Sequence, residues 1–168
     1  MTVDLGLSAQ HSGDVETSQI LATVNLGGSR TPPPGYEVVN AIGFYKMHPT
    51  ALTMDEGREK CAQEGAHIIV LNSDNEADVI RTFLARKPNI PHANSQEYTF
   101  VGLHDWIDEG KFISLLGEPV ENSGFNRWRA GEPNGGRNEN CVMVDKDTKF
   151  VDIDCNWKLF IVCELYDL

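Results

Sequence analysis

The middle of the chain spaces its apolar residues with the period of a helix in two segments. Both segments begin with a capping box, and the paired residues are Thr53 with Glu56 and Ser73 with Glu76. Gly65 supplies a left-handed stop after the first segment, and Pro88 limits the second. The pattern predicts one helix over residues 53–64 and another that begins at residue 73 and ends before Pro88.

The rest of the chain shows short apolar runs between polar loops. Residues 36–47 predict one or two strands around Gly43, and residues 68–71 are typical of a buried strand. Further strands are predicted over residues 99–103, 111–115, 141–145, 150–153 and 158–164. Two helices followed by an antiparallel, loop-rich second half predict an α+β domain over residues 36–168.

A lead segment of residues 1–35 precedes this domain. Its alternating apolar positions, Ile20, Ala22, Val24 and Leu26, predict a half-buried strand. The stretch GGSRTPPPG that follows, residues 27–35, predicts a stiff linker.

Composition narrows the classes of partner. Fourteen basic against 25 acidic residues give a formal charge of −11, which opposes nucleic acid or an anionic membrane surface as the main partner. No apolar run approaches the roughly 18 residues of a membrane span, so membrane insertion is not expected. The first 30 residues lack the basic start and apolar stretch of a secretory signal, so we expect either that a signal has been removed or that Met1 was added to a fragment.

The four cysteines indicate the compartment. No two are spaced as C-x-x-C, which argues against a structural zinc site or a redox motif. An even number of cysteines predicts two disulfides and an extracellular protein, with three pairings open.

The stretch RAGEPNGGRNENC, residues 129–141, concentrates oxygen donors in a segment that suits neither helix nor strand. Glycines let this loop fold back, so the side chains of Glu132, Asn134 and Glu139 can converge. Carboxylate and amide oxygens are the ligands that Ca2+ prefers. Asp152 and Asp154 follow shortly downstream. On composition alone, an acidic surface loop is the simpler interpretation.

A second stretch, LLGEPVEN at residues 115–122, serves as an internal control. It repeats Gly-Glu-Pro but has Val120 where the first loop has Asn134. Valine offers no oxygen, so we expect no metal there.

Several separate motifs resemble the C-type lectin-like domain. They are YTFVGLHDWIDEGKF, FNRWRAGEPN, the triplet Glu139-Asn140-Cys141 and the terminal LFIVCE, and the match covers residues 36–164 in order and spacing. The combination resembles insect humoral lectins of the immulectin kind. The resemblance implies the pairs Cys61–Cys163 and Cys141–Cys155.

The resemblance also implies a principal Ca2+ site that is the sugar receptor. The residues carried over as ligands of calcium and sugar are Glu132, Asn134, Glu139 and Asp152. In the family, the order acid then amide in Glu-Pro-Asn marks the mannose, glucose and fucose class. A misplaced sugar hydroxyl would leave a buried polar group unpaired, at a cost of about 1–3 kcal/mol.

One position departs from the family pattern. Family members with full sugar activity have Asn before the Asp, and this chain has Val151 before Asp152. Valine can neither ligate calcium nor bond a sugar hydroxyl. We therefore expect weaker calcium or monosaccharide binding, which display on a homo-oligomer would offset through avidity.

An enzyme is the competing class. Glu132 and Glu139 would have to divide the roles of acid and ionised partner, as in a glycoside hydrolase, and a shared calcium would keep both ionised. His104 and Asp105 are neighbours in a strand and so point to opposite faces, which argues for structural roles. Trp128 is expected to be a core aromatic that anchors the loop rather than a platform for sugar. We predict a binding protein and not an enzyme.

The leading hypothesis is a secreted, calcium-dependent lectin domain for mannose-type glycans with vicinal diols. Microbial surface polysaccharide or lipopolysaccharide is the expected kind of target, in innate pattern recognition. The alternative is a lectin-like domain that has lost sugar affinity and binds a protein or lipid surface, and Val151 is its main support.

Overall fold

The structure is a computed structural model, which describes residues 32–39 and 42–165. The predicted strand at residues 20–26 lies outside the described residues. Among the described residues, no helix is long and apolar enough to cross a membrane.

Both predicted helices are present. Helix α1 (Met54–Ala62) has the complete capping box at Thr53 and Glu56, and Gly65 adopts a φ of 73° after it. Helix α2 (Asp74–Arg86) has half of its predicted box. The Ser73 hydroxyl accepts from the backbone N–H of Glu76, but the Glu76 carboxylate accepts from the N–H of Asn72, one residue before the cap.

Within the described residues, eight strands form one sheet in the order β1-β2-β8-β4-β6-β7, with β3 on β8 and β5 on β4. They are β1 (Glu37–Val39), β2 (Gly43–Leu52), β3 (Ala66–Ile68), β4 (Thr99–His104), β5 (Ile113–Ser114), β6 (Cys141–Val144), β7 (Val151–Ile153) and β8 (Leu159–Leu165). Two short 3-10 helices, η1 (Val120–Asn122) and η2 (Gly136–Asn138), lie in the loops. The described pairs are antiparallel except β4 with β8, which is parallel and was not predicted.

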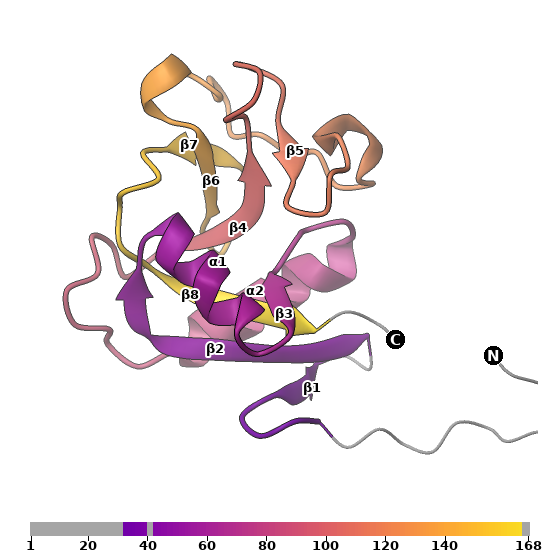
Figure 1. Cartoon of the computed structure of the whole chain (residues 1–168), viewed down its shortest axis with the longest axis vertical. Coiled ribbons are helices and arrows are strands. Elements are labelled where there is room, and N and C mark those ends of the chain that lie inside the picture. Colours follow the sequence, from indigo (N-terminus) through magenta and orange to yellow (C-terminus); the bar gives the residue numbers. More distant parts are fainter. Residues whose placement is uncertain (1–31, 40–41, 166–168) are drawn as a thin grey trace, which may run out of the picture. The chain divides into compact units, whose positions relative to one another are not determined.

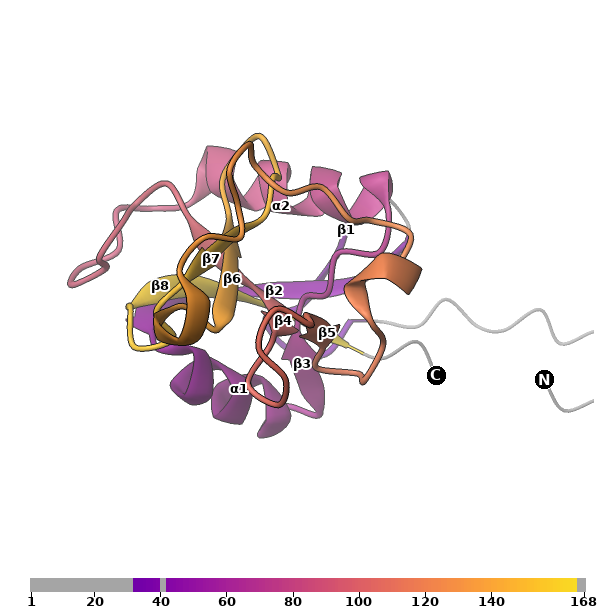
Figure 2. The ribbon, with the colours of Figure 1, turned by 90° about the horizontal axis from the view of Figure 1, so that it is seen from above.

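The helices lie on opposite sides of the strands (Figure 2). A hydrophobic core on the α2 side contains Ile80, Phe83 and Phe150, and a second on the α1 side contains Met54, Ile68 and Ile161. The β4–β5 loop and η2 gather at the end of the domain opposite β1 (Figure 1). This α+β arrangement leaves the long loops to form one end of the domain.

The two disulfides have the pairing that the resemblance implied. Cys61–Cys163 joins α1 to β8, with a Cα–Cα distance of 5.5 Å. Cys141–Cys155 joins the start of β6 to the chain after β7, with a Cα–Cα distance of 5.2 Å. The second bond keeps the ends of two neighbouring strands together beside the oxygen-rich loop.

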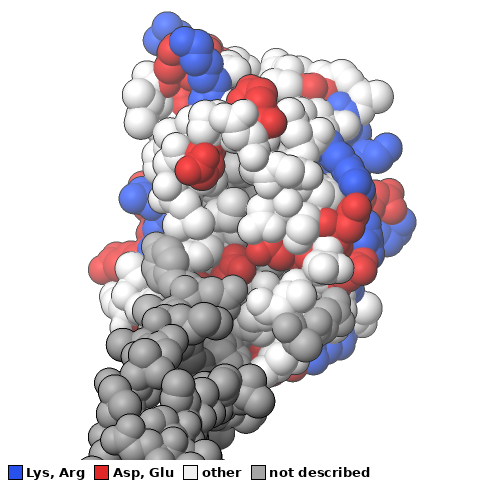
Figure 3. All heavy atoms as spheres, turned by 90° about the vertical axis from the view of Figure 1, so that its right-hand side faces the viewer, with Lys and Arg blue, Asp and Glu red and all other residues white. Residues whose placement is uncertain are grey.

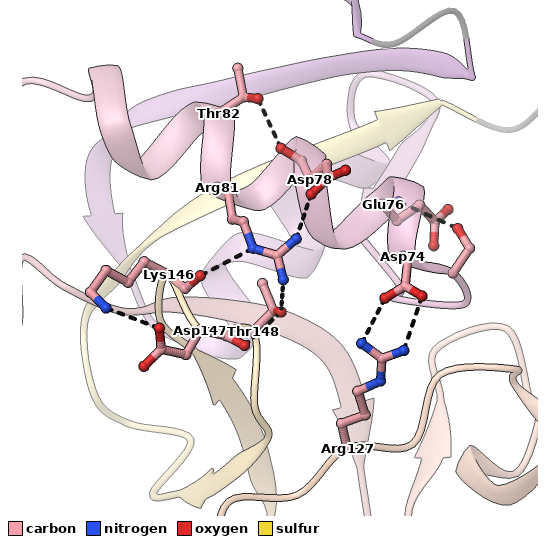
Figure 4. Close-up of polar contacts among 10 residues, drawn as sticks. Asp74, Glu76, Asp78, Arg81, Thr82, Arg127, Lys146, Asp147 and Thr148 are labelled. Atoms are coloured by element: carbon pink, nitrogen blue, oxygen red, sulfur yellow. Dashed lines mark hydrogen bonds and ion pairs between the residues drawn. The ribbon is translucent and has the colours of Figure 1, made fainter.

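Two arginines connect α2 with segments of the second half of the chain (Figure 4). Arg81 donates to the Lys146 carbonyl at 3.3 Å and to the Thr148 hydroxyl at 2.8 Å, in the turn between β6 and β7. Arg127 pairs with both carboxylate oxygens of Asp74, at 2.6 and 3.0 Å. Arg127 is therefore anchored just before the oxygen-rich loop begins.

Candidate functional site

The site loop, residues 129–141, follows Trp128, a partly buried aromatic residue that packs against the core. Trp128 contacts Phe112 and Phe150 edge to face, with ring centroids 4.7 and 5.6 Å apart. The N–H of Arg129 donates to the Phe150 carbonyl at 2.9 Å. The prediction that Trp128 anchors the loop is confirmed by these contacts, which fix the loop against the chain that enters β7.

Asp152 lies beneath the loop. Its side chain is buried in the middle of β7, and its carboxylate oxygens each accept the N–H of Asn134 at 3.0 Å. One of these oxygens also accepts the N–H of Gly135 at 2.7 Å. A charged acceptor makes such hydrogen bonds strong, so Asp152 determines the path of the backbone at Asn134. The Asn134 side chain is left exposed.

Glu132 follows Gly131 and forms a cis peptide bond with Pro133. Its Oε2 atom is buried and has no hydrogen-bond partner. Burial raises the pKa of Glu132, and the neighbouring carboxylates of Asp152 and Glu139 raise it further. An unpaired buried carboxylate oxygen beside two other carboxylates is unfavourable unless a cation or a proton joins it.

Glu139 folds back onto the first half of the loop. A Cβ atom built at Gly135 would lie 2.1 Å from Oε2 of Glu139, so only glycine permits this approach. Burial raises the pKa of Glu139, and the Asp152 and Asp154 carboxylates add to the effect. Asp154 itself accepts hydrogen bonds from the Asn156 backbone and side chain, at 2.9 and 2.8 Å.

The structure thus brings the Glu132, Glu139 and Asp152 carboxylates within electrostatic reach, and it leaves Asn134 at the rim. Among the described residues, no three acidic, histidine or cysteine side chains stand close enough to hold a metal ion as they are arranged. The donor set and the unpartnered Glu132 oxygen fit a hard cation. Coordination would require the Asp152 carboxylate to share or release its bonds to the loop backbone.

Val151 takes no part in this cluster. Its side chain is 8% exposed and belongs to the hydrophobic core that contains Met143 and Ile153. The position before Asp152 therefore faces apolar surroundings, and nothing there contributes an oxygen to the loop.

His104 and Asp105 do not form a catalytic pair. The His104 ring stacks on Trp106 with centroids 3.9 Å apart, and the Asp105 carboxylate accepts the N–H of Gly110 at 2.8 Å. Burial lowers the pKa of His104, and the Arg58 charge lowers it further. Sequence analysis did not single out Trp106 and its exposed neighbour Ile107. Two large apolar residues in a row within an acidic loop were the available indication.

The sequence of this chain was compared with protein families and with known proteins. The Lectin C-type domain family matches residues 50–165. The hemolymph lipopolysaccharide-binding protein of Periplaneta americana is 36% identical over 168 residues, which cover 97% of this chain and 66% of that protein. The mannose-binding protein of Gallus gallus is 35% identical over 106 residues, or 62% of this chain and 37% of that protein.

A solved relative shares the fold. The cow carbohydrate-recognition domain of CD23, crystallised in the presence of a GlcNAc2Man3 oligosaccharide, is 25% identical with a TM-score of 0.66. The match covers 82% of this chain and 98% of that domain. This chain spans less than two thirds of the length of the two curated relatives.

Proposed function

Because this chain belongs to the C-type lectin domain family, we propose that it is a secreted, calcium-dependent lectin domain that binds mannose-, glucose- or fucose-type glycans. The observation that supports this most is the unpartnered, buried Oε2 of Glu132, beside the carboxylates of Glu139 and Asp152. Lectin domains bind carbohydrate without catalysis, in agreement with the prediction that the chain is not an enzyme.

Glu132, Asn134, Glu139 and Asp152 would hold the ion, and bound Ca2+ would supply open coordination positions for two neighbouring sugar hydroxyls. The protein side chains have separate tasks toward the sugar. The Glu132 carboxylate accepts the proton of one hydroxyl, and the Asn134 amide donates to the oxygen of the other. The exposed position of Asn134 leaves its amide accessible to a ligand.

The choice of the mannose class rests on the order of these two groups. An acid at residue 132 and an amide at residue 134 place an acceptor first and a donor second. The printed descriptions of two relatives, a mannose-binding protein and a domain crystallised with GlcNAc2Man3, point the same way.

Microbial surface glycans are the target that we favour. The relative from Periplaneta americana is named for lipopolysaccharide binding in hemolymph, and its match extends over nearly the whole chain. We therefore propose an extracellular role in innate recognition. Because Val151 supplies no ligand, each domain binds one sugar weakly, and a homo-oligomer would raise the affinity for a repeating surface through avidity.

Calcium-dependent retention on a mannose resin tests this function. We expect the protein to bind in millimolar calcium and to elute with EDTA or with free mannose. Glu132→Gln should abolish retention, whereas Glu118→Gln, in the control loop, should leave it unchanged. Retention that survives EDTA, or a Glu132→Gln protein that still binds, would contradict the proposal.

The second candidate is a lectin-like domain without sugar binding that contacts a protein or lipid surface. The burial of Val151 and the engagement of Asp152 with the loop backbone favour it. Its distinguishing result is target binding that chelator does not reduce and that no sugar competes.

A further inference from the structure

Asn134 is the only asparagine in the chain that is followed by a glycine, Gly135. Asparagine is a thermally labile residue, because the backbone nitrogen of the next residue can attack its side-chain carbonyl carbon. A side chain on that next residue hinders the attack, and glycine has none. The sequence therefore makes Asn134 more reactive than the other asparagines of the chain.

The geometry of the site loop requires this reactive pair. Gly135 cannot be exchanged for a residue with a Cβ atom, because that atom would lie 2.1 Å from Oε2 of Glu139. The Asn134 side chain, the proposed donor to the sugar, is exposed at the rim. The close approach of Glu139 thus places an unhindered nitrogen next to an exposed amide.

The Asp152 carboxylate holds both backbone nitrogens of the pair. The Asn134 N–H donates to each of its oxygens at 3.0 Å, and the Gly135 N–H donates to one of them at 2.7 Å. Two successive N–H groups that point at one anion fix the backbone between them. The Gly135 nitrogen is therefore directed at the buried carboxylate, and the loss of its proton beside a negative charge is unfavourable.

We propose that Asn134 is a site of spontaneous deamidation and that the Asp152 carboxylate slows the reaction. In the first step, the Gly135 nitrogen gives up its proton and bonds to the side-chain carbonyl carbon of Asn134. That carbon releases its amide nitrogen, which takes up a proton and leaves as ammonia. Water then opens the cyclic imide at either carbonyl group, which leaves aspartate or isoaspartate at residue 134.

The product changes the site in two ways. An acid replaces the amide donor and adds a negative charge beside the carboxylates of Glu132, Glu139 and Asp152. Isoaspartate also lengthens the main chain by a carbon atom, so the two N–H groups no longer match the oxygens of Asp152. The chemical step is independent of the proposed function, whereas the expected loss of mannose binding rests on it.

Asn122 provides an internal control for the reaction. It is exposed, as Asn134 is, but a serine follows it. It belongs to residues 112–126, which contain only two charged residues. The side of the domain that carries β5 likewise has few charged side chains in its middle (Figure 3). A change at Asp152 should therefore leave the deamidation of Asn122 unaltered as long as the domain stays folded.

The test follows the acid by mass spectrometry of the full chain, kept in EDTA at mildly alkaline pH and then digested. Trypsin releases residues 130–137 as one peptide, in which Asn134 is the only side-chain amide. Asp152→Ala should speed the reaction at Asn134 at least about tenfold, because hydrogen bonds to a charged group are lost. The rate at Asn122 should not change. No acid at Asn134 in either protein, or a rate that Asp152→Ala leaves equal or lowers, would overturn the inference.

Two further variants keep this test decisive. Ser114→Ala removes the buried hydroxyl that accepts backbone N–H groups in the control loop, and it should leave the rate at Asn134 unchanged. Asp152→Asn keeps an acceptor oxygen without the charge, so it should speed the reaction less than Asp152→Ala. It replaces Asp152→Ala if that protein also reacts faster at Asn122. An equal acceleration by Ser114→Ala, or none by Asp152→Asn, would overturn the inference.

A mannose resin separates this inference from the proposed function. Protein that has partly deamidated in EDTA is returned to millimolar calcium and passed over the resin. We expect the unretained fraction to contain the acid at residue 134 and the retained fraction to contain the amide. Equal proportions of acid in the two fractions would refute the effect on binding. If fresh protein is not retained at all, the proposed function fails, whereas the rates measured in EDTA still decide whether Asp152 controls deamidation.

Discussion

Two loops of this domain share the sequence Gly-Glu-Pro, and the structure uses them in opposite ways. The glycines have nearly the same conformation, with φ of 88° at Gly117 and 89° at Gly131. After the proline, however, Val120 is 2% exposed and enters the core, whereas Asn134 is exposed to solvent. The glutamates of the two loops, Glu118 and Glu132, also differ in burial. Glu118 is exposed, and Glu132 has a buried oxygen without a partner.

The support beneath each loop explains the difference. In the control loop, the buried Ser114 hydroxyl accepts the N–H groups of Leu116 and Glu118, at 3.2 and 3.1 Å. In the site loop, the equally buried Asp152 carboxylate accepts those of Asn134 and Gly135. A neutral hydroxyl satisfies the backbone and adds no charge, whereas a carboxylate brings a charge that repels Glu132. We infer that a similar turn becomes a candidate cation site when a carboxylate replaces a hydroxyl beneath it.

Removing these supports should produce the largest contrast. Asp152→Ala leaves two loop N–H groups without their acceptor and deletes a proposed ligand, so we expect calcium-dependent mannose binding to be lost. Unfolding should also become easier by about 2 kcal/mol. Ser114→Ala should cost about 1 kcal/mol and leave binding intact. Chemical denaturation and resin retention measure the two effects. An Asp152→Ala protein that still binds mannose in calcium would contradict the claim that the Asp152 carboxylate makes this loop a cation site.

Exchanging the residue after the proline should separate core packing from binding. Asn134→Val removes the proposed donor, and we expect it to lower mannose affinity at least about tenfold with little change in stability. Val120→Asn buries an amide in the core and should cost about 2–4 kcal/mol without creating a calcium site. Calcium titrations of both proteins test this, and a second calcium equivalent in Val120→Asn would be the contrary result.

Replacing Glu132 and Glu118 by glutamine, one at a time, should give a smaller difference, seen as a change in Tm that depends on pH. Burial and the nearby carboxylates raise the pKa of Glu132 in the absence of a cation, so ionisation of this group destabilises the calcium-free protein. Glu132 therefore favours the folded state when it is protonated. This contribution to stability is complete at a pH below the ordinary glutamate pKa, and it is lost as the pH rises through the raised pKa of Glu132 in the folded protein. Glu132→Gln should therefore raise Tm in EDTA at pH 7.5, and the gain should disappear near pH 4.

The exposed Glu118 supplies the control for this measurement. Glu118→Gln should leave Tm in EDTA unchanged at both pH values, because the carboxylate is exposed to water. An equal rise in Tm for both variants would show that general net charge, and not the local cluster, is responsible.

Restoring a ligand at residue 151 should give the smallest change in calcium binding. Val151→Asn places an amide in an apolar environment, so we expect lower stability in EDTA by about 1–3 kcal/mol. If the amide turns to calcium, the ion should restore part of that loss, and the calcium-induced rise in Tm should exceed that of the unmodified protein. A calcium-induced rise no larger than that of the unmodified protein would mean that residue 151 cannot reach the loop.

Local chemistry made much of the fold predictable. The capping residues Thr53 and Ser73 marked the starts of both helices, and the family resemblance supplied the two disulfide pairs. The parallel pairing of β4 with β8 was missed, because it depends on how distant segments meet and not on any local pattern. Strand β5 is shorter than predicted: the Leu115 N–H still donates to the Gly102 carbonyl of β4, but the Ser114 hydroxyl accepts the N–H groups of Leu116 and Glu118 and turns the chain away.

The candidate site was predictable by residue type but not by arrangement. The glycine-rich loop predicted that Glu132, Asn134 and Glu139 would converge; the two glutamates lie within electrostatic reach of Asp152, whereas Asn134 is exposed at the rim. The hydrogen bonds from the loop backbone to Asp152 could not be read from the sequence, because they depend on β7 lying under the loop. The exposure of Ile107 was equally hidden, since an apolar residue in a sequence predicts burial.

The most direct test of the account is a calorimetric titration of the chelator-free protein with calcium, followed by methyl α-mannoside, and the same mannoside titration in EDTA. We expect saturable calcium binding that Asp152→Ala removes, and mannoside binding only after calcium has been added. Mannoside binding of equal strength in EDTA, or no calcium binding at millimolar concentration, would contradict it.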